Sequence, residues 1–306
     1  MKPARLSPVC SAIRSRTAQN SSSSATEVAW PASRKERFFS IEFVLAEAPP
    51  RYNACMTLVE AALTPFRAPP IQPLKALHAF RRLLADKEDT TQVFEIMRAL
   101  SGGSIARGYQ RMIGTVEGGR QAFLRTELAT KLDDPAWLAQ FGPGTVGAAY
   151  RAFREARGFT AEGLADEARK VAPDAVDLPH PVMWYSRRIR DVHDIWHILT
   201  GYETDALGEA CVVAFSYAQT GNLGFAFIGW GAAREIQREN RSVPARRAVL
   251  QAYGLGRKAA WLPALDYEDL FAVPLDAARD RLRLTAPTIY QRVSPETRLG
   301  LRLRGG

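Results

Sequence analysis

Hydrophobic side chains recur at helical spacing along the chain from about residue 70 onward. In the first such segment they lie three or four residues apart, at Leu74, Leu77, Phe80, Leu83 and Leu84. This is the spacing of one face of an α-helix. No long stretch alternates between apolar and polar positions, and β-branched residues rarely cluster as they do in sheets. The pattern predicts an all-α fold.

Short polar signals predict where several helices begin. Asp89 followed by Gln92 indicates one start. Asp134-Pro135 has the residue types favoured at the N-cap and at the first helical position, and Thr145 fits a further N-cap. Residues 171–181 contain three prolines and predict a loop between two groups of helices. Because the helices on both sides carry one apolar face that needs a partner, we expect a single helical domain.

The N-terminal segment, residues 1–55, differs from the rest of the chain. Up to Thr26 it has four basic residues and no acidic ones, and it contains the serine run 21–24. This composition predicts disorder and resembles a mitochondrial transit peptide. The alternative is a start codon assigned too far upstream, with the protein beginning at Met56. We therefore expect a disordered extension over 1–55 and a helical domain over 56–306.

Charge and cysteine content narrow the possible partners. The net charge is +9, of which residues 1–55 supply +4 from eight Lys/Arg and four Glu, so the other 251 residues carry about +5. This mild excess fits an anionic lipid surface or an acidic substrate, and we do not expect nucleic acid as a partner. The cysteines, Cys10, Cys55 and Cys211, are far apart, so neither a disulfide framework nor a thiolate zinc site is predicted and a reducing compartment is expected.

The least polar part of the chain is the segment 210–233, which contains no charged residue. Thr220-Gly221-Asn222 interrupts it, so it predicts two apolar helices around a break rather than a membrane span. Such helices are frequently plain core. The complete lack of charge over this length also suits the wall of a tunnel for a lipid tail.

The segment 185–199 combines a helical apolar pattern with candidate metal ligands. Its apolar positions are Tyr185, Ile189, Val192, Trp196 and Leu199. On this helix His193 and His197 are four residues apart, so they lie on one face at a spacing that allows both imidazoles to bind one divalent ion. Asp194 lies about 100° further round the axis. It is either a third ligand or an acceptor that orients a ring N–H.

Glu209 is a candidate ligand from a second helix. On one straight helix it would lie roughly 18 Å from His197, too far for a shared ion. However, Gly201 is suited to end a helix and Thr204-Asp205 to start another, so the chain is expected to fold back and bring Glu209 to the histidines. Nitrogen and oxygen ligands of this kind suit zinc and, less well, iron or manganese.

Two other interpretations of the histidine pair stay open at this point. Many H-x-x-x-H pairs on helices are structural or lie on the surface. Histidine–aspartate pairs also occur in metal-dependent phosphohydrolases, which need a further histidine well upstream and a distant aspartate. Only His78 and His180 lie upstream here, and their order and spacing fit that class poorly.

The string His193-Asp194-x-x-His197 followed by eleven residues and Glu209 resembles the HDxxHx11E signature of the ubiquinone-biosynthesis family called Coq-four. The surrounding RDVHDIWHILTGYETDALGEACVVAFSYAQTGN is also similar to that family, as are Asp266-Tyr267-Glu268 and the stretch from Val273-Pro274-Leu275 to Arg279. The resemblance covers roughly residues 70–290. It implies that the metal, zinc in that family, is held by His193, Asp194, His197 and Glu209.

The same resemblance implies a step in ubiquinone biosynthesis. Family members act on a hydroxybenzoate ring with a polyprenyl tail, removing its carboxyl group and placing a hydroxyl on the same carbon. The implied enzyme is a lyase of the 4-hydroxy-3-methoxy-5-polyprenylbenzoate decarboxylase type. The alternative function is a lipid-binding scaffold with a structural metal that organises other ubiquinone-biosynthesis proteins.

Candidate substrate contacts lie on both sides of the motif. One of the arginines before it, Arg187 or Arg190, could pair with a substrate carboxylate. Tyr202 and Asn222 could donate hydrogen bonds, and Tyr217 and Phe225 could line the tunnel. A polyprenyl substrate implies peripheral attachment to a membrane, on the cytoplasmic side of a bacterial inner membrane or the matrix side of a mitochondrial one. We also expect a homodimer.

Overall fold

The computed structural model describes residues 65–86, 89, 91–157, 161–173 and 177–301. Within these ranges every regular element is a helix, and the only extended pairing is a bridge between Thr145 and Pro274. The prediction of an all-α fold is confirmed. The predicted extension over residues 1–55 lies outside the described residues, so its boundary stays a prediction.

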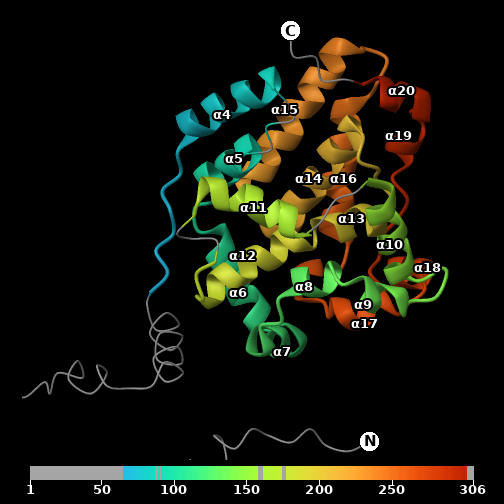
Figure 1. Ribbon diagram of the computed structural model, residues 1–306. Helices are drawn as coiled ribbons and strands as arrows, with labels where there is room; N and C mark the ends of the chain where they lie inside the picture. The colour runs from blue at the N-terminus through green and yellow to red at the C-terminus, as the bar shows by residue number, and fades with distance from the viewer. Residues whose placement is uncertain (1–64, 87–88, 90, 158–160, 174–176, 302–306) are drawn as a thin grey trace, which may run out of the picture. The chain divides into compact units, whose positions relative to one another are not determined.

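The helices keep one set of labels in the text and in Figure 1. In chain order they are α4 Pro73–Ala85, α5 Thr91–Ser101, α6 Ser104–Ile113, α7 Val116–Leu124, α8 Leu128–Leu132, α9 Pro135–Ala139, α10 Val146–Arg157, α11 Ala161–Val171, α12 Pro181–Asp191, α13 His193–Thr200, α14 Ala206–Thr220, α15 Leu223–Glu239, α16 Ala245–Lys258, the 3-10 helix η1 Leu262–Ala264, α17 Tyr267–Phe271, α18 Leu275–Arg281, α19 Thr288–Gln291 and α20 Pro295–Gly300.

Three long helices, α14, α15 and α16, pack against one another at the centre of the helical assembly (Figure 1). The pair α4 and α5 packs on α15, and α11 packs on α5. The shorter helices α10, α17 and α18 form a second group in which α10 contacts both of the others and α13. As a result α13 lies between this second group and the start of α14, with which it is also in contact.

Helix α14 lies where three hydrophobic clusters meet. Leu207, Val213 and Phe215 each belong to a different cluster, and none of them is more than 7% exposed. Because neighbours surround the helix on most sides, a charged side chain beyond its first turns would be buried without a partner. This explains why α14 has no charged residue after Glu209.

The helix starts predicted at Asp134 and Thr145 agree with the structure. The Asp134 side chain accepts a hydrogen bond from the backbone N–H of Ala136 at 2.9 Å and caps α9. The hydroxyl of Thr145 accepts from the N–H of Ala148 at 3.2 Å at the start of α10. The predicted loop over residues 171–181 connects α11 to α12.

Two details of the structure differ from what the apolar periodicity of the sequence predicts. The helix expected over 185–199 is interrupted at Val192, although Val192 itself is buried. Leu74, which the periodicity places with the buried stripe of α4, is 73% exposed. Helix α4 instead turns Ala76 and Ala79 inward, because small side chains allow α4 and α5 to approach closely.

The charge-free segment forms α14 and α15 as predicted. Gly221 ends α14 with a positive φ of 68°, and the Asn222 side chain caps α15 by accepting from the N–H of Gly224 at 2.8 Å. Among the described residues no helix combines the length and the apolar character needed to cross a bilayer. Since many side chains of both helices lie in the core clusters, a lipid tunnel along them stays a prediction.

Candidate metal centre

The turn between α13 and α14 brings the histidine motif to the first turn of α14. Gly201 ends α13 with φ 75°, a left-handed conformation that favours glycine, and its N–H donates to the carbonyl of His197 at 2.9 Å. The Asp205 side chain caps α14 by accepting from the N–H groups of Leu207 and Gly208. The chain thus folds back as its sequence predicts, and Glu209 faces the histidines.

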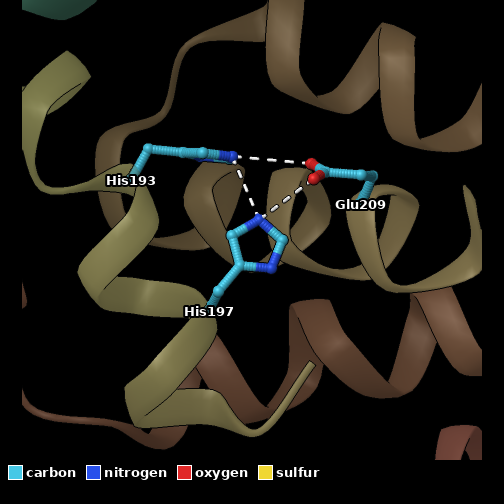
Figure 2. Close-up of side chains that lie close together, drawn as sticks. All are labelled: His193, His197 and Glu209. Atoms are coloured by element: carbon cyan, nitrogen blue, oxygen red, sulfur yellow. Dashed lines mark hydrogen bonds and ion pairs between the residues drawn. The ribbon is translucent and has the colours of Figure 1, made fainter. Parts of the chain in front are cut away.

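Three side chains converge at this point, as Figure 2 shows. Nε2 of His193 lies 3.3 Å from Nε2 of His197. The two Glu209 carboxylate oxygens lie 3.5 Å from His193 Nε2 and 3.4 Å from His197 Nε2, one oxygen to each ring. One potential ligand atom from each of these residues lies within 4.8 Å of the others. Two helices therefore supply two imidazoles and one carboxylate to one location.

His197 is held rigidly for this role. Its side chain is 1% exposed, and Nδ1 lies 3.0 Å from the backbone carbonyl of Tyr202. An N–H at Nδ1 that donates to this carbonyl leaves Nε2 directed at the other two side chains. Hydrogen bonds of this kind fix the tautomer of metal-binding histidines.

The electrostatics of the group favour a bound cation. Burial favours the neutral ring of His197, yet its pKa is raised above 6.5 because the Glu209 carboxylate and the Tyr202 carbonyl stabilise the charged ring. Burial likewise opposes ionisation of Glu209, but the two imidazoles hold the pKa of its carboxyl far below its usual range. The carboxylate is thus ionised at neutral pH, and a proton or a metal ion can balance its charge.

The donor set fits a zinc ion. Zinc binds imidazole nitrogen and carboxylate oxygen at about 2.0–2.2 Å and prefers a tetrahedron, whose edges at this radius are about 3.3–3.6 Å. The 3.3 Å between the two Nε2 atoms matches such an edge, and the two Glu209 oxygens lie at 3.4 and 3.5 Å, one from each ring, so a small rotation of the carboxylate is needed for one oxygen to share the ion with both rings. His193 and Glu209 are 24% and 43% exposed, so the group is reached from the surface on their side.

Asp194 is not among these three converging residues. It is half-buried on α13, next to His193 in sequence, and its charge contributes to the raised pKa of His197. Its predicted role as a fourth ligand stays a prediction, as do the ligand roles of the other three.

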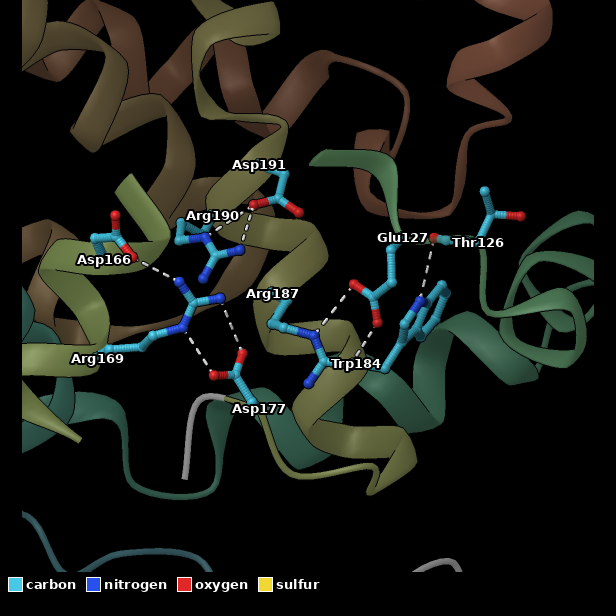
Figure 3. A network of polar contacts seen from close by, with 9 residues as sticks. All are labelled: Thr126, Glu127, Asp166, Arg169, Asp177, Trp184, Arg187, Arg190 and Asp191. Atoms are coloured by element: carbon cyan, nitrogen blue, oxygen red, sulfur yellow. Dashed lines mark hydrogen bonds and ion pairs between the residues drawn. The ribbon is translucent and has the colours of Figure 1, made fainter. Parts of the chain in front are cut away.

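The two candidate arginines pair with carboxylates, as Figure 3 shows. Arg187 donates to both oxygens of Glu127, at 2.6 and 3.2 Å, and to the carbonyl of Leu178. Arg190 pairs with its neighbour Asp191 at 2.7 Å. Burial raises the pKa of Asp191 to about 6 in spite of Arg190. A substrate carboxylate would have to compete with these partners.

The other candidate contacts are spread along α14 and α15. Tyr202 is buried beside His197, with its ring edge against Tyr290. Tyr217 stacks on Tyr253 about 12 Å further along α14 than Glu209, judged from the rise per residue. Asn222 and Phe225 lie beyond the end of that helix, and Asn222 is occupied as the cap of α15. Of these four, Tyr202 is the one in contact with a member of the histidine group.

A cavity of about 330 Å³ adjoins His197. Its lining is Ala149, Ala152, Phe153, His197, Ile198, Gly201, Tyr202, Glu203, Leu275 and Arg279. The guanidinium of Arg279 donates to the carbonyls of Ile198 and Leu199 at the end of α13, at 2.9 and 3.1 Å. Sequence periodicity did not reveal this cavity, because α10, α13 and α18 are far apart along the chain.

Comparisons with known proteins agree with this architecture. A family model described as coenzyme Q (ubiquinone) biosynthesis protein Coq4 matches residues 74–288. The chain is 28% identical over 176 residues to the mitochondrial ubiquinone biosynthesis protein COQ4 homolog of Homo sapiens, covering 57% of this chain and 63% of that protein. It is 32% identical over 128 residues to the Rattus norvegicus homolog, covering 39% of this chain and 47% of that protein. The chain thus matches about half to two-thirds of these relatives' length.

A solved structure shares the fold. The crystal structure of a Nostoc punctiforme PCC 73102 protein, described as a ubiquinone biosynthesis protein, aligns with a TM-score of 0.53 and 21% sequence identity. The alignment covers 71% of this chain and all of that chain. At this identity the likeness concerns the fold alone.

Proposed function

The chain belongs to the coenzyme Q (ubiquinone) biosynthesis protein Coq4 family, and on that premise we propose that it acts in ubiquinone biosynthesis as a metal-dependent decarboxylase. The substrate class is a hydroxybenzoate ring that carries a polyprenyl tail. The observation that carries this proposal is the convergence of His193, His197 and Glu209 from two helices at a place reached from the surface.

In this proposal the chain's own residues hold a divalent cation beside the substrate. His193, His197 and Glu209 would bind it, with Asp194 as the fourth ligand, and zinc fits the donors better than iron or manganese. A bound cation supplies Lewis acidity, which stabilises the negative charge that develops when the carboxyl group leaves as carbon dioxide. The bond between the ring and the carboxyl carbon breaks, and its electron pair stays on the ring. In a simple decarboxylation a proton from water then adds to that ring carbon. Placing a hydroxyl there instead requires molecular oxygen as a two-electron oxidant together with one water molecule, and hydrogen peroxide is released.

The cavity beside His197 suits the ring of the substrate. Its volume of about 330 Å³ lies within the range of small-molecule sites. Phe153 offers an apolar wall, since its ring centroid lies 5.9 Å from that of His197. Arg279 is a basic side chain in the lining, and we assign it the carboxylate contact for which the sequence suggested Arg187 or Arg190. The carboxylate would replace Asp276, which is 95% exposed and lies 3.3 Å from Nη1 of Arg279.

The polyprenyl tail places this activity at a membrane. We propose peripheral attachment, on the cytoplasmic side of a bacterial inner membrane or the matrix side of a mitochondrial one, and contact with other ubiquinone-biosynthesis proteins. The charge-free segment 210–233 of α14 and α15 supports a path for the tail, and a homodimer is the proposed assembly.

A scaffold with a structural metal is the second candidate. It is favoured by the way Glu209 of α14 reaches the histidines of α13, because a cation there would fasten the two helices together.

The test that separates the enzyme from the scaffold is release of carbon dioxide from carboxyl-labelled polyprenyl hydroxybenzoate in detergent or vesicles. Arg279→Lys keeps a charge at the cavity but loses the guanidinium fork, and we expect its KM to rise more than its kcat falls. If metal-saturated wild-type protein releases no carbon dioxide, the enzyme proposal is wrong and the scaffold is preferred.

A further inference from the structure

Helix α7 has its large apolar side chains on the outside. Val116 is 95% exposed, Phe123 85% and Leu124 52%. The inward side of the same helix carries Gly118, Gln121 and Ala122. At 100° per residue the three exposed apolar residues span an arc of about 100°, and the exposed Arg120 lies within the same arc, so this side of the helix is apolar with one basic residue. A helix in a soluble protein normally has the opposite orientation.

This outward orientation is fixed by contacts on the inner side. The buried Gln121 donates to the Asp266 carboxylate at 2.6 Å, and Arg120, which is 57% exposed, reaches round the helix to the same carboxylate at 2.7 Å. The hydroxyl of Thr115 accepts from the N–H of Gly118 and donates to the carbonyl of Met112, which ties the start of α7 to the end of α6. A side chain at Gly118 would meet that carbonyl at 2.3 Å, so only glycine allows this approach.

Basic and apolar side chains flank the exposed face of α7. Ile113 at the end of α6, three residues before Val116, is 41% exposed. Arg111 in the last turn of α6 and Arg125 at the C-cap of α7 are also exposed. Arg111 lies over the ring of Trp261 at 4.3 Å and lines a polar cavity of about 290 Å³ together with Arg257. Segment 104–127 holds four arginines and two glutamates.

We propose that this face, formed by Ile113, Val116, Phe123 and Leu124, docks on an anionic lipid bilayer. Apolar side chains on the outer side of a short helix enter the boundary between headgroups and acyl chains, while flanking arginines bind anionic headgroups. A second copy of the chain fits the face less well. A stable interface buries about 800 Å² per partner, more than one side of a nine-residue helix offers. A symmetric dimer centred on α7 would also place Arg111 and Arg125 close to the arginines of the other copy.

Membrane docking by α7 rests on the proposed function in one respect: a polyprenylated substrate is held in a membrane, so the protein must reach one. Docking itself needs neither the substrate nor the metal. Protein carrying His193→Ala and His197→Ala should therefore bind vesicles as wild type does, so failure of the metal chemistry and failure of docking can be told apart.

The test is co-sedimentation of the full chain with vesicles of phosphatidylcholine, with and without phosphatidylglycerol. Wild-type protein should prefer the anionic vesicles and dissociate at high salt. Val116→Ser with Phe123→Ser should weaken this binding at least about tenfold, because two exposed apolar side chains no longer enter the bilayer. Leu250→Ser on α16, where Leu250 is 58% exposed, is the matched control and should bind as wild type does.

Thermal melting of each variant checks the fold, and exposed positions should change it little. Equal vesicle binding by the double variant and the wild type would overturn the proposal. So would a double variant that keeps vesicle binding but changes from dimer to monomer in analytical ultracentrifugation, since that outcome assigns the face to a second copy.

Discussion

Glu209→Gln tests the coupling between Glu209 and His197 without any metal present. The change keeps the size of the side chain but removes the negative charge that lies 3.4 Å from His197 Nε2. In the wild type this charge raises the pKa of His197 above its unfolded value of 6.5. In the variant burial, the Tyr202 carbonyl and the charge of Asp194 remain as influences on this pKa, and burial favours the neutral ring. We expect the pKa of His197 in the variant to fall.

The sign of the stability effect follows from this shift. A folded-state pKa above 6.5 means that the interaction stabilises the metal-free protein fully below pH 6.5 and is lost as pH rises through the folded pKa. An exposed ion pair contributes about 0.2–1 kcal/mol, whereas breaking a buried one costs about 3–5 kcal/mol. Because His197 is buried and Glu209 is 43% exposed, we expect the free energy of unfolding of the variant to be about 2 kcal/mol lower than that of the wild type below pH 6.5, and little changed at alkaline pH.

The assay is urea unfolding of chelator-treated protein at a pH well below 6.5 and at a pH well above the folded pKa of His197. Glu155→Gln, at an exposed position on α10, is the matched control and should leave the free energy of unfolding unchanged at both pH values. A Glu209→Gln deficit that is the same at both pH values would refute the coupling. An increase in stability at low pH would refute it as well.

Two further substitutions test how the site is positioned. Gly201→Ala forces a Cβ into a left-handed conformation of φ 75°, so it should lower the free energy of unfolding by about 1–2 kcal/mol in thermal or urea unfolding and also weaken metal binding. Unchanged stability would contradict the role of this turn. Asp266→Ala removes the cap of α17 and the partner of Arg120, and should lower the free energy of unfolding by about 1–2 kcal/mol at neutral pH. The cap hydrogen bonds and Arg120 lower the pKa of Asp266 despite its burial, so this stability difference should shrink as pH falls through the folded pKa. A difference independent of pH would contradict the assignment.

Local signals in the sequence were sufficient to predict that His193, His197 and Glu209 come together. The spacing of His193 and His197, the helix-ending Gly201 and the capping Asp205 act over a few residues, so they predict the return of the chain to Glu209. The interruption at Val192 could not be predicted, because the apolar periodicity continues across it without a change.

Long-range pairing accounts for what the sequence did not reveal. Arg187 is paired with Glu127, sixty residues away, and no local pattern indicates this partner. The cavity beside His197 likewise requires α10 and α18 to meet around α13. Periodicity also identifies an apolar face without showing whether that face turns inward. The outward orientation of the apolar side chains of α7 was therefore not predicted, and Leu74 was wrongly expected on the buried side of α4.

The central claim is that His193, His197 and Glu209 form a metal site, and elemental analysis of purified protein tests it most directly. We predict about one divalent ion per chain in the wild type and in the His78→Ala control, whose histidine is exposed on α4. Protein with His193→Ala and His197→Ala should contain almost none, because the carboxylates of Glu209 and Asp194 alone do not retain the ion. Equal metal content in the double variant and the wild type would contradict the account.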